Sequence, residues 1–195
     1  MILVRKLKDE QGEKMSNIHY NSAFESLSYQ EIDKWIKDNE SQLIGSAIFS
    51  KNNSIISKII TYFERIKGKC ADFIPSHTGS IVKCDDEIYL FNVKPLFASK
   101  ILLADYIAET DDDFLLILKD FKLNNKKFSN DILEHEGDFY PFLSAIRSIG
   151  TKRKTKRSHC SELHLKALQN QGLYKGINPE INPFELLLLL KRVIK

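Results

Sequence analysis

Apolar residues recur along the chain with two spacings, one typical of helices and one typical of strands. Ser28-Tyr-Gln-Glu31 predicts a helix-starting capping box, and Ile32, Trp35 and Ile36 form a stripe behind it at helical spacing. Further helices are predicted over residues 54–68, 96–108, 129–136 or 139–148, 160–171 and 183–195.

Short apolar runs predict the strands, which cover residues 43–49, 79–83, 87–93 and 114–118. Cys84-Asp85-Asp86-Glu87 separates the second strand from the third and predicts a hairpin with a two-residue turn at Asp85-Asp86. The polar, lysine-rich residues 119–130 indicate a surface loop. Because strands and helices are interleaved, the sequence predicts an α+β fold.

The pattern also divides the chain. Residues 1–41 predict an N-terminal appendage with one helix, and residues 42–195 predict the main domain. A chain of 195 residues is long enough for such a domain to bury a sizeable core.

Composition narrows the class of protein. Hydrophobic residues make up 43% of the chain and charged residues 28%, which is ordinary for a folded protein, and the net charge of +3 gives no reason to expect specific nucleic-acid binding. Three cysteines are too few for a disulfide framework and indicate a reducing compartment. We see no signal peptide, and the longest apolar run, 184–190, is too short to span a bilayer. We therefore expect a cytoplasmic protein, or a virion-associated one if its source is a virus.

The candidate chemistry centres on Cys160, which stands at the start of a predicted helix. Exposed N–H groups and the helix dipole at that position stabilise a thiolate, and the five basic residues within 152–157 act in the same direction. The same N–H groups could stabilise an oxyanion.

His77 and Asn92 are the candidate partners of this cysteine. If Asp85-Asp86 is a two-residue turn, Asn92 opposes Gly79, which shares a face of the sheet with His77. Asn92 could then hold the imidazole in the tautomer that Cys-His-Asn catalysis needs, whereas a one-residue change in the turn would move Asn92 to the other face. We expect Gly79 to leave room beside the histidine.

These residues resemble a known family in both motif and order. Four motifs are similar to those of the permuted branch of the NlpC-type papain-like superfamily, which includes lecithin:retinol acyltransferases. In chain order they are Gly45-Ser-Ala-Ile-Phe49, Ser76-His-Thr-Gly-Ser-Ile-Val82, Cys160-Ser-Glu-Leu163 and Pro183-Phe-Glu-Leu186. The resemblance covers roughly residues 42–195. Tyr140-Pro141 stands where the family has a tyrosine-aspartate pair, which leaves the role of Tyr140 open.

The resemblance implies a circularly permuted papain-like fold, in which a small antiparallel sheet packs with helices and the nucleophile begins a late helix. It also implies a thiol-dependent hydrolase that cleaves an amide or ester bond through an acyl-enzyme, with Cys160, His77 and Asn92 as catalytic residues and with no cofactor or metal. The substrate could be a peptide, including a cell-wall peptide, or a lipid, and an amine could replace water as the acyl acceptor. The alternative is a catalytically inactive papain-like module with a structural or interaction role, within a larger assembly such as a virion.

Several residues near the motifs also have simpler interpretations. Glu162 fits the first turn of a helix without any function, and His159 and His164 flank Cys160 at a spacing that does not match a usual zinc site. The basic run 152–157 indicates a solvated loop or, alternatively, a patch that binds nucleic acid or phosphate. The leucines of 186–190 read as a buried helix face, and a protein partner could bind this helix or residues 1–41.

Overall fold

The structure is a computed structural model, and it describes residues 17–51, 57–58, 61–62, 73–93, 96–140 and 160–193. Every structural statement below concerns these residues. The predicted helix at 54–68 and the basic run 152–157 lie outside them, apart from residues 57–58 and 61–62.

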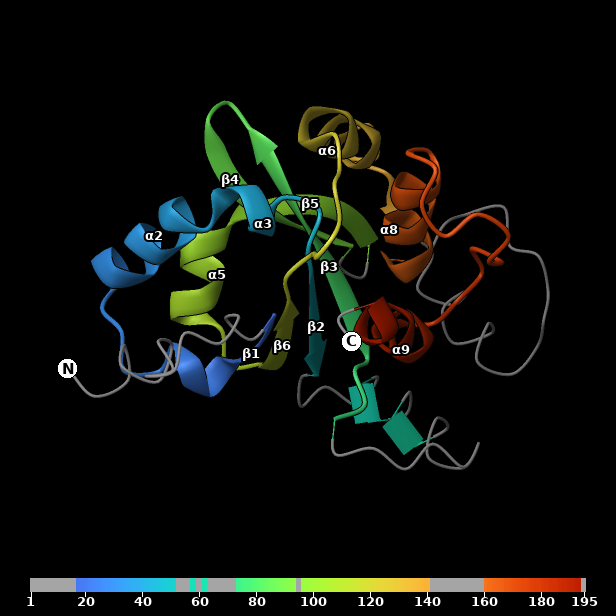
Figure 1. The fold of residues 1–195 in the computed structure, drawn as a ribbon. Coiled ribbons are helices and arrows are strands. Elements are labelled where there is room, and N and C mark those ends of the chain that lie inside the picture. Colours follow the sequence, from blue (N-terminus) through green and yellow to red (C-terminus); the bar gives the residue numbers. More distant parts are fainter. Residues whose placement is uncertain are drawn as a thin grey trace.

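An antiparallel sheet forms the centre of the protein (Figure 1). Its strands follow one another in the order β1-β6-β2-β3-β4-β5-β7, and every neighbouring pair is antiparallel. Their bounds are β1 (Ile18–Tyr20), β2 (Ala47–Lys51), β3 (His77–Cys84), β4 (Glu87–Val93), β5 (Leu96–Leu102), β6 (Asp113–Ile117) and β7 (Phe139–Tyr140).

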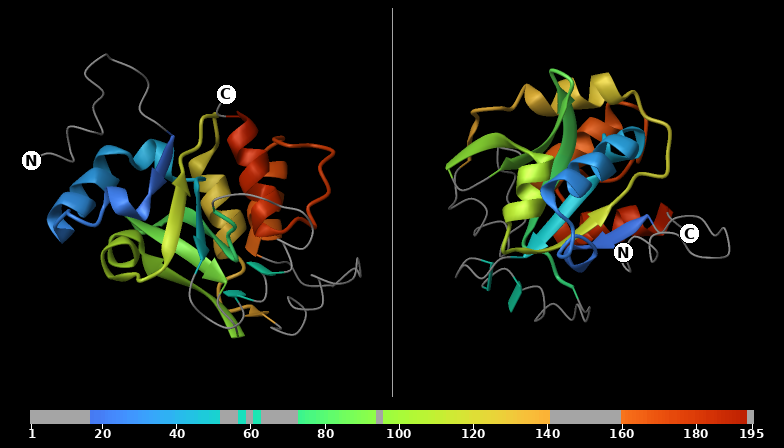
Figure 2. Two further views of the ribbon diagram at one scale, coloured as in Figure 1. Left: turned by 90° about the horizontal axis from the view of Figure 1, so that it is seen from below. Right: turned by 90° about the vertical axis from the view of Figure 1, so that its left-hand side faces the viewer.

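Helices cover both faces of the sheet. On one side lie α2 (Tyr29–Asp38), α3 (Glu40–Leu43) and α5 (Leu103–Glu109), and on the other lie α6 (Asn125–Leu133), α8 (Cys160–Gln169) and α9 (Pro183–Val193). Figure 2 shows the same two-sided arrangement from below and from the side. A short 3-10 helix, η1 (Asn21–Ala23), precedes α2. The predicted α+β class is confirmed.

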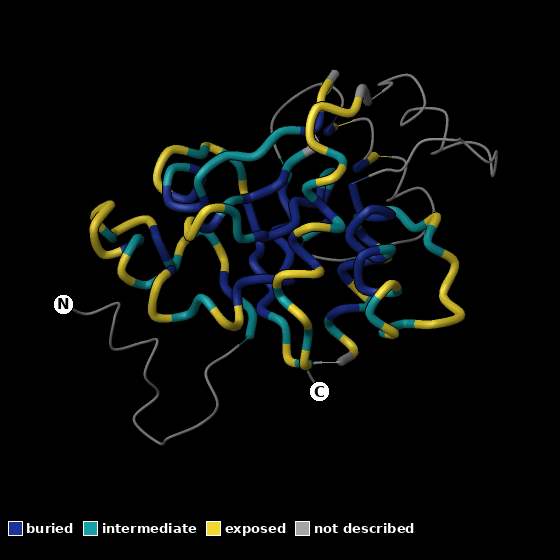
Figure 3. Tube along the Cα trace, turned by 90° about the horizontal axis from the view of Figure 1, so that it is seen from above, coloured by how far each residue is buried: buried dark blue, intermediate teal, exposed yellow. Residues whose placement is uncertain are grey.

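Two apolar clusters hold these layers together, one on each face of the sheet. Neighbouring residues of one strand enter opposite clusters, as Ile81 and Val82 of β3 do, because successive side chains of a strand point to opposite faces. The cluster under α8 contains Leu163 and Leu168, and the cluster under α2 contains Ile32. The buried residues accordingly concentrate along the central strands in Figure 3.

The hairpin of β3 and β4 has the predicted turn and register. Cys84 pairs with Glu87, and Gly79 pairs with Asn92. Asp85 and Asp86 have φ values of 48° and 66°, so both adopt the left-handed conformation that a two-residue type I′ turn requires. The expected role of Gly79 is wrong, however. A Cβ atom there would lie 2.5 Å from Leu90 Cδ1, so the glycine makes room for β4 and not for the histidine.

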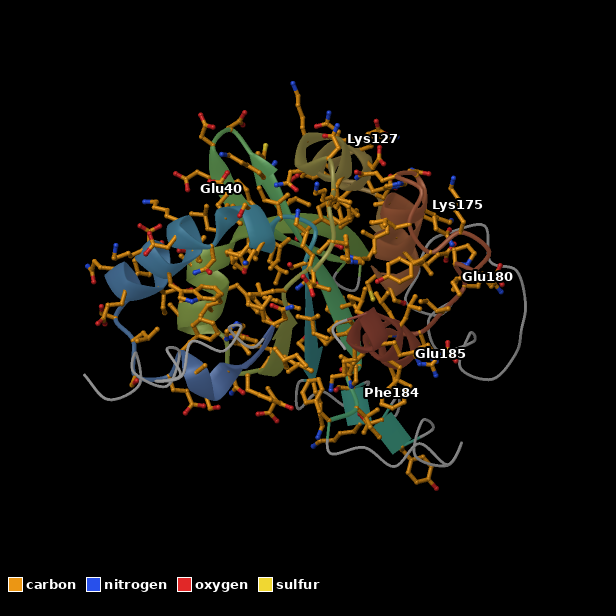
Figure 4. The ribbon with its side chains drawn as sticks, in the orientation of Figure 1. Glu40, Lys127, Lys175, Glu180, Phe184 and Glu185 are labelled. Atoms are coloured by element: carbon orange, nitrogen blue, oxygen red, sulfur yellow. The ribbon has the colours of Figure 1, made fainter. Side chains whose placement is uncertain are left out.

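Helix starts also follow the sequence closely. Ser28 and Glu31 form the predicted capping box at the start of α2. Asn182 Oδ1 accepts from the Glu185 N–H at 2.9 Å, and the Glu185 carboxylate accepts from the Asn182 N–H at 3.0 Å, so α9 begins at Pro183 as expected. Figure 4 labels Glu185 and its buried neighbour Phe184 at this helix start.

Three predicted elements differ from the structure. Residues 96–108 were expected to be one helix, but residues 96–102 form β5 between β4 and β7, with Phe97 exposed and Ala98 buried in strand alternation. The strand expected from Leu43 begins at Ala47, because Leu43 ends α3 and Gly45 turns the chain with φ +90°. The loop expected over 119–130 ends at Asn124, which caps α6 (Asn125–Leu133), so the helix predicted over 129–136 begins earlier, and residues 139–140 of the alternative 139–148 form β7.

Residues 18–38 pack closely against the rest of the protein. β1 pairs with β6 at the edge of the sheet, and the Tyr29 hydroxyl donates to Asp105 of α5 at 2.8 Å. The division of the chain at residue 41 stays a prediction. No helix within the described ranges has the length and apolar character needed to cross a membrane.

Candidate active site

Cys160 is the first residue of α8, which packs its apolar side against β3. Leu163, Ala167 and Leu168 are buried in the cluster beneath the helix, and Cys160 itself is 9% exposed. Ser161 donates its hydroxyl to the carbonyl of Ile181, which ties the helix start to the segment before α9. The packing therefore holds the helix start in a fixed place above the sheet.

His77 is the first residue of β3, at the end of the strand nearest to Cys160. It pairs with Ser50 of β2, and its side chain is half-buried. The imidazole forms a hydrogen bond with the Cys160 thiol. The structure thus brings together two residues that lie 83 positions apart in the sequence (160 minus 77).

Asn92 completes this group from β4. The hairpin register places it opposite Gly79, and its side-chain oxygen Oδ1 contacts Nε2 of His77. Because an amide oxygen only accepts hydrogen bonds, Nε2 carries the ring hydrogen, which leaves Nδ1 for the thiol. The three predicted site residues therefore lie in one chain of contacts, Asn92 to His77 to Cys160.

The contacts favour the charged forms of the cysteine and the histidine. Burial opposes the Cys160 thiolate, but the charge of His77, its hydrogen bond, and backbone N–H groups of Thr78 and Ser161 outweigh burial and lower the pKa of the thiol. Burial likewise opposes the His77 imidazolium, but the Cys160 thiolate and the hydrogen bond to Asn92 are chief among the contacts that raise the pKa of the imidazole. Both shifts favour a thiolate–imidazolium pair.

A second polar contact between α8 and β3 lies one turn beyond Cys160. His164 is completely buried, and its Nδ1 lies 2.9 Å from the Ser80 hydroxyl oxygen. Its Nε2 has no hydrogen-bond partner, and its ring meets Phe128 edge-on at 5.4 Å between centroids. Burial lowers the pKa of His164 to about 4, so this histidine is neutral near pH 7.

The other residues that the sequence analysis singled out lie outside the Cys160–His77–Asn92 group or outside the described residues. Glu162 is buried and pairs with Lys166 at 2.6 Å, as a carboxylate in a first helical turn can do without any catalytic role. Cys84 has a free thiol in the hairpin, and burial heads the causes that raise its pKa. Cys70 and His159 lie outside the described residues, as does the side chain of Tyr140.

Metal binding has no support within the ranges that the structure describes, because no group of three His, Cys, Asp or Glu side chains gathers there. Leu186, Leu187 and Leu190 are buried as the helix-face interpretation predicts, while Leu188 is 41% exposed.

Sequence reasoning missed three contributors to this site. The Thr78 amide was missed because backbone donors leave no trace in residue type. The Ser80–His164 contact joins residues 84 positions apart. Asp112, whose charge helps to raise the pKa of His77, lies in a run of three aspartates between the predicted helix at 96–108 and the predicted strand at 114–118, where no motif marked it.

Chemically, the arrangement suits nucleophilic attack by sulfur. A thiolate is the reactive form of cysteine, and an imidazolium beside it can give its proton to a leaving group. The N–H groups of the first helical turn have no carbonyl partner within the helix and can donate to a developing oxyanion.

Comparisons of the chain with protein-family models, with curated protein sequences and with solved structures found no match.

Proposed function

We propose that the protein is a cysteine hydrolase that cleaves an amide or ester bond through an acyl-enzyme. The observation that carries the proposal is the chain of contacts from Asn92 through His77 to Cys160 at the start of α8. A buried structural cysteine has no need of a histidine that is itself oriented by an amide oxygen. A catalytic cysteine uses the histidine as its base, and the amide oxygen holds that base in the required orientation.

Cys160 and His77 carry out the bond-making and proton-transfer steps of the proposed reaction. The Cys160 thiolate attacks the substrate carbonyl carbon and forms a C–S bond, while the backbone N–H of Cys160 stabilises the oxyanion. His77 gives its proton to the departing amine or alcohol as that bond breaks. His77 then takes a proton from water, which attacks the thioester and releases the acid together with the thiolate. Asn92 keeps the imidazole in place throughout.

We further propose that the fold is a permuted papain-like one. The support is the order of parts along the chain: the strand with His77 comes first, and the helix with Cys160 comes late and packs on that strand. The motif resemblance points the same way. Peptides and lipids both stay open as substrates, and an amine could take the place of water as acyl acceptor. The few cysteines favour action in the cytoplasm or another reducing compartment.

A turnover assay tests the proposal. The purified chain is incubated with fluorogenic peptide amides, with muropeptides, and with short- and long-chain lipid esters. We expect hydrolysis of at least one class, its loss in Cys160→Ala and its retention in Cys84→Ala, the matched control. Activity that survives Cys160→Ala would refute the proposal. Absence of turnover, together with a Cys160 that reacts no faster than Cys84, would instead favour the non-catalytic module.

A further inference from the structure

Polar side chains lie in a row at the end of the sheet that carries His77, on three strands and on the residue that precedes a fourth. Ser50 directly opposes His77 across β2 and β3, and it opposes Phe114 across β2 and β6. Asp112 precedes Phe114 by two positions and lies just before β6, which begins at Asp113 opposite Lys51, so it stands at the same end of the sheet as Ser50. With Asn92 on the other flank of His77, the polar row runs Asn92, His77, Ser50, Asp112.

Tyr106 of α5 covers this polar row and connects its members. The side chain is 8% exposed, and its ring lies 5.8 Å from that of Phe114. Its hydroxyl makes hydrogen bonds with Ser50 and Thr110, and Thr110 Oγ1 accepts from the Asp112 N–H at 3.2 Å. Burial raises the pKa of Tyr106 to about 12, and the charge of Asp112 contributes, so the hydroxyl stays neutral.

We propose that Asp112 is a positioning residue of the Cys160–His77 site: its carboxylate places a negative charge behind His77 and favours the thiolate–imidazolium pair over the neutral pair. The inference rests on the proposed function and adds a fourth side chain to it. Asp112 does not touch the reacting atoms, and it acts only through the charge state of His77.

The surroundings of His77 leave Asp112 as the charge that can do this. Within the described ranges, Ser50 of β2 pairs with His77, Asn92 of β4 contacts its imidazole, and Tyr106 of α5 is hydrogen-bonded to Ser50, and all three are neutral groups. Burial disfavours the imidazolium, the Cys160 thiolate and the bond to Asn92 favour it, and Asp112 adds a further favourable charge that raises the His77 pKa. A charge in a partly buried position is screened less than one in water.

The neighbours of Asp112 provide matched controls. Asp111 and Asp113 carry the same charge within one residue of it, yet both are exposed while Asp112 is half-buried. Asp113 is the first residue of β6 and points to the opposite face from Phe114. A general effect of negative charge near the site would be shared by all three aspartates, whereas the proposed effect belongs to Asp112.

The experiment measures alkylation of Cys160 by iodoacetamide from pH 4 to pH 9, followed by mass spectrometry of the Cys160 peptide. At neutral pH, where the neutral pair competes with the thiolate–imidazolium pair, Asp112→Asn should react up to about fivefold more slowly than the unmodified chain, the order expected for one charge about 10 Å away at an effective dielectric constant between those of a protein surface and water. On the acidic limb, where His77 is already protonated, Asp112→Asn should react no more slowly. Above the range in which His77 titrates, the rates should converge. Asp112→Glu should restore the rate, and Asp111→Asn and Asp113→Asn should leave it unchanged.

The outcomes separate this inference from the proposed function. If Cys160 of the unmodified chain reacts no faster than Cys84 below pH 7, the proposed function fails. If it does react faster but Asp112→Asn matches the two controls, the inference alone fails. Thermal unfolding of each variant guards against a folding defect. Should Asp112→Asn not fold, Asp112→Ser tests the same charge, and an unchanged rate in that variant would overturn the inference.

Discussion

Protonation of His164 should make the protein lose stability as the pH falls, by an amount that follows from the burial of this side chain. The folded state lowers the pKa of His164 from 6.5 to about 4, so below pH 6.5 the unfolded chain binds a proton that the folded protein does not. Stability from this group is therefore complete above pH 6.5 and is lost as the pH falls toward 4. A difference of about 2.5 pH units corresponds to about 3 kcal/mol in total, of which about 2 kcal/mol is lost by pH 5.

Urea unfolding, followed by the fluorescence of the single tryptophan Trp35, measures this loss. The matched variant is His164→Asn, whose side-chain amide can still reach the Ser80 hydroxyl but does not titrate. The variant will be less stable at every pH, because the ring leaves a cavity in the core. Only the change with pH is compared, since His19, whose pKa is also lowered by burial, titrates in both proteins.

We expect the unmodified chain to lose about 2 kcal/mol more than His164→Asn between pH 7.5 and pH 5. Equal losses in the two proteins would refute the reasoning, because they would show that His164 titrates alike in the folded and unfolded states. A smaller extra loss, near 1 kcal/mol, would mean that the buried ring finds a proton acceptor for Nε2 on protonation.

Three further predictions concern the hairpin, its asparagine and the turn before β2. Asn92→Ala should lower turnover by roughly ten- to a hundredfold, less than the full loss in Cys160→Ala, with little change in melting temperature. Insertion of one glycine between Asp85 and Asp86 shifts the register by one residue, so steady-state kinetics should show a loss of turnover at least as large as that of Asn92→Ala. Gly45→Ala should lower the free energy of urea unfolding by at least about 1 kcal/mol, because φ is +90° there and an added Cβ would overlap a leucine methyl group; a change within error would contradict this.

Much of the site could be predicted from the sequence because the register of the hairpin depends on a few neighbouring residues. The two-residue turn at Asp85-Asp86 fixes which residues of β3 and β4 oppose each other, and that register alone places Asn92 near His77. The position of Cys160 at a helix start was likewise a local matter of capping and apolar spacing. In both cases, residues close in sequence determine the local structure.

The parts that could not be predicted depend on distant pairings. β5 reads as a helix in sequence, and it is a strand because β4 and β7 offer hydrogen bonds on both sides of it. Ser80 and His164 meet only because α8 packs on β3, and the segment with Asp112 reaches the His77 end of the sheet only because β6 pairs with β2. Residue spacing does not predict any of these pairings, because they depend on contacts between segments far apart in the sequence.

The most direct test of the Cys160–His77 pair is the pH dependence of Cys160 alkylation in the unmodified chain and in His77→Ala, with Cys84 as the internal reference. A free cysteine thiol titrates near pH 8.5. We predict that Cys160 reacts with iodoacetamide well below that value, faster than Cys84, and that His77→Ala removes most of this advantage. A Cys160 rate that rises only above pH 8, or one that His77→Ala leaves unchanged, would contradict the account.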